Sequence, residues 1–258
     1  MTTPFSLQIV SSRLTTRFLG RRILHLPSVD STMNAAKREA AAGAPEGTVM
    51  LAEEQTEGRG RLGRDWVSPA GGNIYVSLLL RPSPAQAEQL AMTTPLAVCR
   101  AVEETSGLVA HIKWPNDVLL NGRKVCGILI ESVFEGERLA YVVAGIGVNV
   151  NFDPTPFEDI RETATSLSRE LGRDVSREEL LASLLNHFEA LYLSPGEAVF
   201  ADWKKRLETL GRPVRVQLTG KVEEGIAEDV DRLGRLIIRQ GDGTMVVVSA
   251  GDVTPASS

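Results

Sequence analysis

Residues 124–150 read KVCGILIESVF, then EGE, then RLAYVVAGIGVNV. Two apolar runs rich in Val and Ile flank the polar turn Glu135-Gly136-Glu137, and this pattern predicts an antiparallel hairpin. Helices are predicted on either side of it, over residues 86–107 and over residues 176–192, which open with a capping box. Together, the hairpin and the helices predict an α+β domain with a mainly antiparallel sheet packed with helices.

The pattern changes after Gly211. From there on, short runs of β-forming residues are separated by glycines at positions 220, 234, 241 and 243. Short strands with glycine turns between them predict a small β-barrel. We therefore expect a main domain at residues 1–210 and a C-terminal barrel at residues 211–258, with a loose polar tail over residues 254–258.

Composition limits the classes of function. The chain has 258 residues, a formal net charge of −5 and 43% hydrophobic residues, as in an ordinary globular protein and unlike a disordered chain. The acidic balance argues against bulk nucleic-acid binding, so no nucleic-acid partner is expected. Two cysteines, Cys99 and Cys126, cannot form a disulfide framework. The longest uncharged stretch, residues 139–152, has 14 residues, whereas a membrane helix needs roughly 20. We expect a cytoplasmic protein with no membrane partner.

Residues 58–66, GRGRLGRDW, are the strongest functional signal. Three arginines alternate with glycines, so that guanidinium groups and exposed backbone N–H groups can surround a phosphate or a carboxylate. The structural alternative is a solvated surface loop. Gly58, Gly60 and Gly63 also satisfy the dinucleotide pattern GxGxxG, but residues 65–69 do not have the helical pattern which that site requires.

Further motifs place polar groups at the ends of predicted elements. Residues 113–117, KWPND, combine a cation, a ring, an amide and a carboxylate at a proline bend, although they are also good turn chemistry. Lys124 begins an apolar strand, where it can extend to solvent or neutralise a reacting phosphate. Residues 145–151, GIGVNVN, suit either a bulge or the close approach of a ligand to the backbone. Ser31 and Thr32 can cap the helix that follows or bind a polar ligand head.

Taken in order, these motifs closely resemble the signatures of biotin protein ligases, also called biotin–[acetyl-CoA-carboxylase] ligases. The resemblance covers residues 21–253 and includes a C-terminal SH3-like barrel. It implies a reaction in two steps. The carboxylate of biotin attacks the α-phosphate of ATP, which gives biotinyl-5′-AMP and pyrophosphate, and a lysine amine of a biotin carboxyl carrier protein then displaces AMP. The resemblance also implies that Mg²⁺ accompanies ATP.

The resemblance assigns a role to each motif residue. Lys124 and Arg61 are implied to be catalytic, at the reacting phosphate. The implied biotin-binding residues are Ser31, Thr32, Gln55, Arg59, Gly60, Arg61, Lys124, Gly127 and Gly145. The implied ATP- or adenylate-binding residues are Arg61, Arg64, Trp66, Asn116, Lys124 and Asn149, and Asp117 is the implied metal ligand.

Three rival functions accompany this interpretation. A lipoate–protein ligase shares the reaction class, but the arginine motif that ends in Trp66 favours biotin. In a non-catalytic binding module the barrel would be the working part, and Lys124→Ala would leave activity unchanged. The third rival is a dinucleotide-dependent oxidoreductase, which absence of NAD binding would remove. About twenty residues precede the region of resemblance, too few for the helix-turn-helix repressor domain of many bacterial relatives, so a monofunctional ligase is expected. The resemblance also allows a homodimer formed through the sheet of the main domain.

Overall fold

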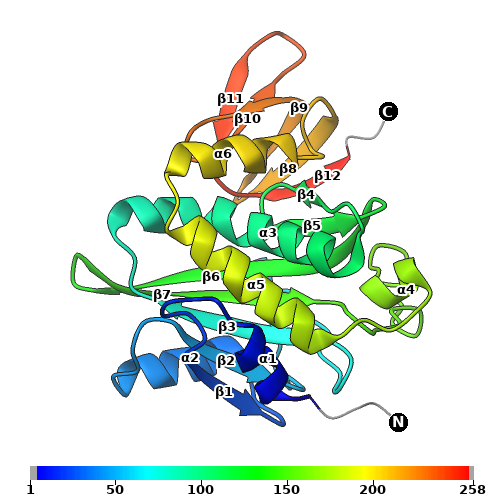
Figure 1. Ribbon diagram of the computed structural model, residues 1–258. Coiled ribbons are helices and arrows are strands. Elements are labelled where there is room, and N and C mark those ends of the chain that lie inside the picture. Colours follow the sequence, from blue (N-terminus) through cyan, green and yellow to red (C-terminus); the bar gives the residue numbers. More distant parts are fainter. Residues whose placement is uncertain (1–4, 256–258) are drawn as a thin grey trace.

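The computed structural model describes residues 5–255, and Figure 1 shows how their elements are arranged. Within those residues the main sheet has seven strands in the order β1-β2-β3-β7-β6-β5-β4. Neighbouring strands are antiparallel except for β1 and β2, which run parallel. The predicted α+β class with a mainly antiparallel sheet is confirmed. The strand bounds are β1 Arg22–Leu26, β2 Thr48–Ala52, β3 Ile74–Leu80, β4 His111–Lys113, β5 Asp117–Leu120, β6 Arg123–Glu135 and β7 Arg138–Val148.

The predicted hairpin lies in the middle of this sheet. β6 and β7 pair from Cys126 opposite Val148 to Glu135 opposite Arg138. Gly136 in its turn has a φ of 62°, a left-handed conformation that glycine adopts without strain. β3 pairs with the other edge of β7, so the apolar run of β7 has a partner strand on each side. Its backbone groups are therefore satisfied within the sheet.

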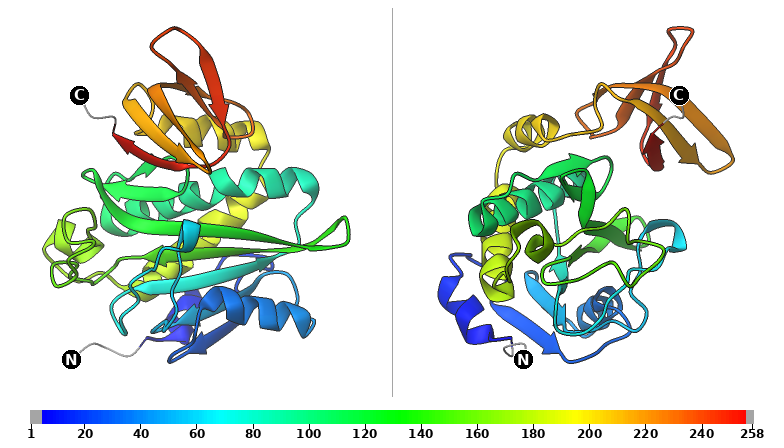
Figure 2. Two further views of the ribbon diagram at one scale, coloured as in Figure 1. Left: turned by 180° about the vertical axis from the view of Figure 1, so that it is seen from behind. Right: turned by 90° about the vertical axis from the view of Figure 1, so that its right-hand side faces the viewer.

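Helices lie on both faces of the sheet. α3 (Pro84–Ser106) and α5 (Arg177–Tyr192) pack against each other over one face, and α1 (Leu7–Arg13) packs on α5. Figure 1 shows α3 and α5 in front of the sheet, and Figure 2 shows the shorter α2 (Thr32–Ala41) on the opposite side. The larger apolar core lies under α3 and α5, whereas a small core joins α2 to Leu79 and Val143. Alternate residues of β3 and β7 therefore face different layers.

The chain passes from the main domain to its C-terminal part through α6 (Gly196–Lys205). After α6, the chain extends beside the edge strand β4. The Ile112 N–H donates to Arg206 O (2.8 Å), and the Glu208 N–H donates to Ile112 O (2.9 Å). This pairing protects an otherwise unpaired sheet edge and fixes the start of the C-terminal part against the main domain.

The C-terminal part is a five-stranded antiparallel sheet in residues 213–255, with the order β11-β10-β9-β8-β12. Figure 2 shows it curling over the end of the main domain beyond α6. Residues 256–258 of the predicted loose tail lie outside the described residues. No helix within residues 5–255 is long and apolar enough to cross a membrane. The strand bounds are β8 Pro213–Leu218, β9 Lys221–Val230, β10 Leu236–Arg239, β11 Met245–Val248 and β12 Asp252–Pro255.

Candidate active site

Three glycines lie in two rows of paired residues across the sheet, on the face that α2 covers. In one row Ser77 of β3 lies opposite Gly145 of β7. In the next row Tyr75 lies opposite Gly147, which in turn lies opposite Gly127 of β6. Two neighbouring strands, β6 and β7, thus present glycine backbone at the same place. The sequence pattern indicated this use of glycine within the run 145–151, and β6 adds the third glycine.

Two side chains lie directly on these glycines. A Cβ atom at Gly145 would lie 2.8 Å from Met33 Sδ of α2. Cβ atoms at Gly127 and Gly147 would lie 2.7 Å and 2.5 Å from the ring of Trp66. Because real Cβ atoms do not come this close to other heavy atoms, only glycine allows Met33 and Trp66 to pack here. The Trp66 Nε1 is buried and has no hydrogen-bond partner within residues 5–255, so it remains available to an acceptor on a ligand.

The start of α2 carries the first predicted pair, Ser31 and Thr32, next to Gln55. Ser31 is the N-cap residue, and its Oγ accepts a hydrogen bond from the Met33 N–H (3.2 Å). Gln55 Oε1 accepts from the Thr32 N–H (2.9 Å) and from the Thr32 hydroxyl (3.1 Å). Gln55 Nε2 donates to Ser68 Oγ (3.0 Å). Ser31 is therefore explained by capping, whereas Thr32 and Gln55 form one polar group.

Residues 58–66, which we call the arginine loop, fold back on themselves. The Gly60 N–H donates to Arg64 O (2.7 Å), and the Trp66 N–H donates to Gly58 O (2.9 Å). The tip is a single 3-10 turn, Arg61–Gly63, and Leu62 there has a φ of 57°. No α-helix begins at Gly63, so the dinucleotide pattern in these glycines is coincidental.

The three arginines of the loop point to three different partners. Arg59 Nη2 donates to Asn34 Oδ1 (2.7 Å). Arg61 Nη1 donates to Asn116 Oδ1 (3.0 Å) and to Gly251 O (3.3 Å). Arg64 forms a bidentate pair with Asp252 and stays largely exposed. Burial lowers the pKa of Arg61. Of the three arginines in the loop, Arg61 is the one most shielded from water.

Lys124 reaches the same place from the start of β6. Its Nζ lies 2.7 Å from Asp117 Oδ1 and 5.3 Å from the centre of the Trp66 ring, in a cation–π arrangement. Because Asp117 follows Asn116 in the chain, Lys124 and Arg61 bind neighbouring residues. The structure therefore brings the two predicted catalytic cations together, together with Asn116, Asp117 and Trp66.

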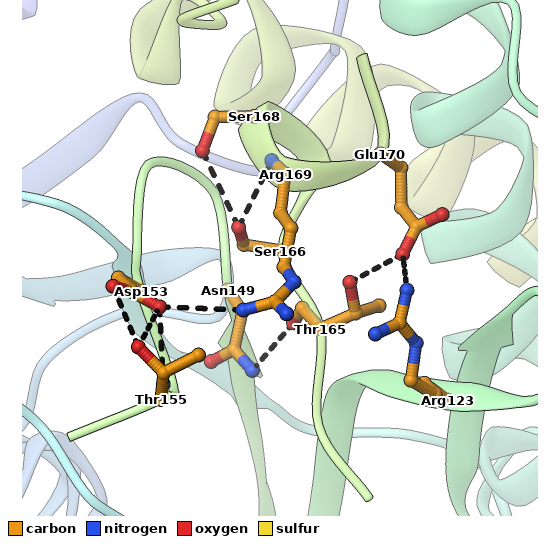
Figure 3. Close-up of polar contacts among 9 residues, drawn as sticks. All are labelled: Arg123, Asn149, Asp153, Thr155, Thr165, Ser166, Ser168, Arg169 and Glu170. Atoms are coloured by element: carbon orange, nitrogen blue, oxygen red, sulfur yellow. Dashed lines mark hydrogen bonds and ion pairs between the residues drawn. The ribbon is translucent and has the colours of Figure 1, made fainter. Parts of the chain in front are cut away.

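Asn149 lies at the end of β7 and is enclosed by the segment that leads to α4 (Leu167–Leu171). Its Nδ2 donates to Thr165 O (3.0 Å), as Figure 3 shows. The same segment reaches the backbone of Lys124: Lys124 N–H donates to Thr163 O, and Thr165 N–H donates to Lys124 O, both at 2.8 Å. Asn149 and Lys124 are therefore held by one stretch of chain, and the Asn149 side chain already has a structural partner.

Comparison with known proteins agrees with this geometry. The model of the biotin/lipoate A/B protein ligase family matches residues 25–149, and the model of the biotin protein ligase C-terminal domain matches residues 209–254. The biotin–[acetyl-CoA-carboxylase] ligase of Paracoccus denitrificans is 40% identical over 236 residues, which are 87% of this chain and 97% of that relative. The chain belongs to the biotin protein ligase family.

Further relatives extend this assignment. The ligase of the same name from Mycobacterium tuberculosis is 40% identical over 229 residues, 83% of this chain and 81% of that relative. The structure of the Aquifex aeolicus biotin protein ligase in complex with biotin and ATP matches with a TM-score of 0.78 at 30% identity, over 92% of this chain and 100% of that chain. The protein is thus an ATP-dependent biotin ligase, and the lipoate alternative has less support.

Some contacts at the site of this ligase carry no sequence signal. Asn34 binds Arg59. In the sequence it follows the recognised pair Ser31 and Thr32 and looks like any other helix residue. Asp252 binds Arg64 across 188 residues of chain. Gly147 lies within a recognised motif, but its contact with Trp66 is visible only in the tertiary structure. Such partners are found only when the fold brings distant segments together.

The site suits a metal that arrives with the nucleotide better than a resident one. No group of three or more His, Cys, Asp or Glu side chains suited to a metal ion occurs in residues 5–255. Asp117, the predicted ligand, has its carboxylate bound to Lys124. Mg²⁺ that carries ATP needs only one or two protein carboxylates, because phosphates and water supply its other ligands. Asp117 fits that limited role.

Space at the site is limited in the described residues. A cavity of about 410 Å³ lies at the β4 edge, lined by Leu108, His111 and Arg212 among others, and not at the site. Above Gly127 and Gly147 the space is filled by Trp66. Ligands that approach these glycines must therefore displace or stack beside that ring.

Proposed function

We propose that this ligase activates biotin over the glycines of β6 and β7, with the vitamin head beside Thr32 and Gln55 and the adenylate beside Trp66. The observation that carries the proposal is the meeting of Arg61 and Lys124 at the adjacent residues Asn116 and Asp117. Two anions, the carboxylate of biotin and the triphosphate, have to react with each other. Fixed cations offset the repulsion between them and stabilise charge at the reacting phosphorus.

The proposed roles follow the position of each residue. Arg61 and Lys124 act at the reacting phosphate. The remaining members line the two halves of the site. The proposed biotin side consists of Ser31, Thr32, Gln55, Arg59, Gly60, Gly127 and Gly145, and the proposed nucleotide side consists of Arg64, Trp66, Asn116 and Asn149, with Asp117 as the single protein carboxylate for Mg²⁺.

In the first step a carboxylate oxygen of biotin bonds to the α-phosphorus, and the bond from that phosphorus to pyrophosphate breaks. The leaving pyrophosphate takes the electron pair. Lys124 exchanges Asp117 for the phosphate, and Arg61 exchanges its neutral acceptors for phosphate oxygen. Charge-assisted hydrogen bonds of this kind contribute about 1.5–3 kcal/mol each. Bound Mg²⁺ would neutralise charge on the pyrophosphate.

In the second step the amine of an acceptor lysine attacks the carbonyl carbon of biotinyl-5′-AMP. The carbon–oxygen bond to AMP breaks, AMP leaves, and the nitrogen loses a proton to give an amide. The mixed anhydride must be kept from water until the acceptor arrives. The arginine loop lies over the site, contains three glycines and has an exposed stretch at residues 62–65, which suits a cover that changes position.

The partner we propose is the biotin carboxyl carrier protein of acetyl-CoA carboxylase or of a related carboxylase, in the cytoplasm, where ATP is available. A homodimer is a further proposal. It is supported by β6, because β5 pairs with β6 only as far as Gly127 and leaves the rest of that edge without a strand in the described residues. Sedimentation of the purified protein measures this directly. We also propose that residues 1–210 and 211–258 are separate domains.

Pyrophosphate exchange tests the proposed chemistry, because it reports the first step alone. We expect exchange that depends on biotin and is not supported by lipoate. Lys124→Ala should lower its rate at least 100-fold without a change in the folded state, since the loss of a fixed cation at a developing charge costs about 2.7–4 kcal/mol. Lys204→Ala, which removes a surface pair with Asp229, is the matched control. Unchanged exchange in Lys124→Ala would contradict the proposed site.

A further inference from the structure

Ser77 of β3 is a buried serine that touches the proposed biotin side and has no assigned role. Its side chain lies on the face of the sheet that α2 covers, opposite Gly145, and the residue is fully buried. The Ser77 hydroxyl lies 2.8 Å from the Thr32 hydroxyl. Nothing in the sequence distinguishes Ser77 from its neighbours, because a lone serine in an apolar strand has no local signal.

The direction of each hydrogen bond in this group follows from chemistry. A backbone N–H only donates, so the atom of Gln55 that faces the Thr32 N–H is the carbonyl oxygen Oε1. That oxygen only accepts, so the Thr32 hydroxyl must donate its single proton to it. With its proton used, the Thr32 oxygen can only accept from Ser77. Ser77 therefore donates, and the polarity of the whole group is fixed.

This polarity leaves two groups free for a ligand. The Thr32 oxygen has two lone pairs and uses one for Ser77, so one acceptor position remains. Gln55 Nε2 uses one N–H for Ser68, so one donor position remains. A cyclic urea such as the head of biotin presents an N–H and a carbonyl oxygen side by side. One free acceptor beside one free donor is complementary to it.

We propose that Ser77 is a positioning residue that determines specificity: it holds the Thr32 hydroxyl so that its free lone pair accepts a ureido N–H of biotin. This inference rests on the proposed biotin side of the site. Ser77 acts through Thr32. A substrate without a ureido N–H would leave that lone pair buried and unpaired, which is the most effective way for a polar site to reject an analogue.

Steady-state pyrophosphate exchange with Ser77→Ala tests the inference. We expect the KM for biotin to rise about 2- to 12-fold, the range that corresponds to one neutral hydrogen bond, while the KM for ATP stays unchanged. Biotin methylated on a ureido nitrogen is the second probe. The factor by which the enzyme prefers biotin over this analogue should fall in Ser77→Ala. Ser77→Cys, which keeps the shape of the side chain at a slightly larger volume and weakens the donor, should shift both quantities in the same direction by less.

Ser183→Ala is the matched control. Ser183 is also a buried serine with one side-chain hydrogen bond, to Glu104, and it lies on α5 away from the site. It should leave both KM values and the preference unchanged. If the Ser77 variants raise the KM for both substrates equally, or leave the preference unchanged, Ser77 is merely structural and the inference is overturned.

Thr32→Val separates this inference from the proposed site. A higher KM for biotin in Thr32→Val together with unchanged kinetics in both Ser77 variants overturns the role of Ser77 alone. Unchanged kinetics in Thr32→Val overturns the proposed biotin side itself, and the inference falls with it.

Discussion

At the scale of single residues, the contact between Trp66 and two glycines explains why the site tolerates no side chain there. Gly127 and Gly147 lie opposite each other in neighbouring strands, and the indole ring lies on both. An added methyl group at either position would overlap the ring. Trp66, Gly127 and Gly147 come from separate parts of the sequence, and they pack together only because the two glycines have no side chain. Composition alone does not reveal this contact.

Gly147→Ala should displace the Trp66 ring. Overpacking at a site with no room costs about 1–3 kcal/mol, so we expect the ring to move and the KM for ATP to rise at least fivefold. The change in Trp66 environment is measured by tryptophan fluorescence and the KM by pyrophosphate exchange. Gly241→Ala is the control, because a Cβ atom at Gly241 meets no atom within 4 Å. A wild-type KM for ATP in Gly147→Ala would contradict the proposed nucleotide side.

At the scale of elements, α4 fixes the position of the segment behind the site. Glu170 on α4 accepts from Thr165, Asn121 and Arg123, and Figure 3 shows the first and last of these contacts. Burial by itself raises the pKa of Glu170, but the hydrogen bonds from Thr165 and Asn121 and the charge of Arg123 outweigh it and hold the pKa below its ordinary value. The carboxylate thus fixes the segment that binds the backbone of Lys124.

Glu170→Gln should lower the free energy of unfolding at neutral pH by about 1 kcal/mol, a value discounted because Arg123 is partly exposed. Because the pKa of Glu170 is lower in the folded state, its carboxylate stabilises the fold at pH values above the unfolded-state pKa of about 4.3. This stability is lost as the pH falls through the folded-state pKa. The difference between the two proteins should therefore shrink as the pH is lowered below about 4.

Urea unfolding at a series of pH values measures this difference. Glu224→Gln, which removes an exposed pair with Arg215 in the barrel, is the control and should have little effect at any pH. A difference between Glu170→Gln and the parent that stays constant with pH would show that the carboxylate charge is not what stabilises this segment.

At the scale of the whole molecule, the barrel touches the arginine loop. The carbonyl of Gly251 accepts from Arg61, and Asp252 at the start of β12 pairs with Arg64. Arg64 holds the pKa of Asp252 below its ordinary value, with burial opposing and Lys113 and Arg61 adding to the effect. One carboxylate of the C-terminal part thus faces three cations of the main domain.

Asp252→Asn should loosen the arginine loop. The pair is largely exposed on the Arg64 side, so its loss costs at most about 1 kcal/mol, and we expect the KM for ATP to rise about two- to fivefold. Trypsin should cleave faster after Arg59, Arg61 and Arg64 in the absence of ligands. Glu228→Gln, which removes a pair with Arg239 inside the barrel, should change neither quantity. Cleavage at the parent rate would show that the barrel does not hold the loop.

Local patterns were enough for the elements whose contacts are close in sequence. The turn at Gly136 predicted the hairpin of β6 and β7, and the capping box at Ser176 predicted the start of α5, because both depend on residues a few positions apart. The parallel pairing of β1 with β2 was not predicted, since α2 separates the two strands and nothing local records their register. The same limit applies to β12, whose partner β8 lies far back in the chain.

The sequence by itself determined the reaction class, because its charged and glycine motifs occur in the order that biotin protein ligases share. Which donor meets which acceptor was decided by the tertiary structure: Lys124 with Asp117, Arg61 with Asn116, and Ser77 with Thr32. The physical reason is distance. Hydrogen bonds and ion pairs depend on positions to within an ångström, and such positions exist only after the sheet has brought separate strands into register.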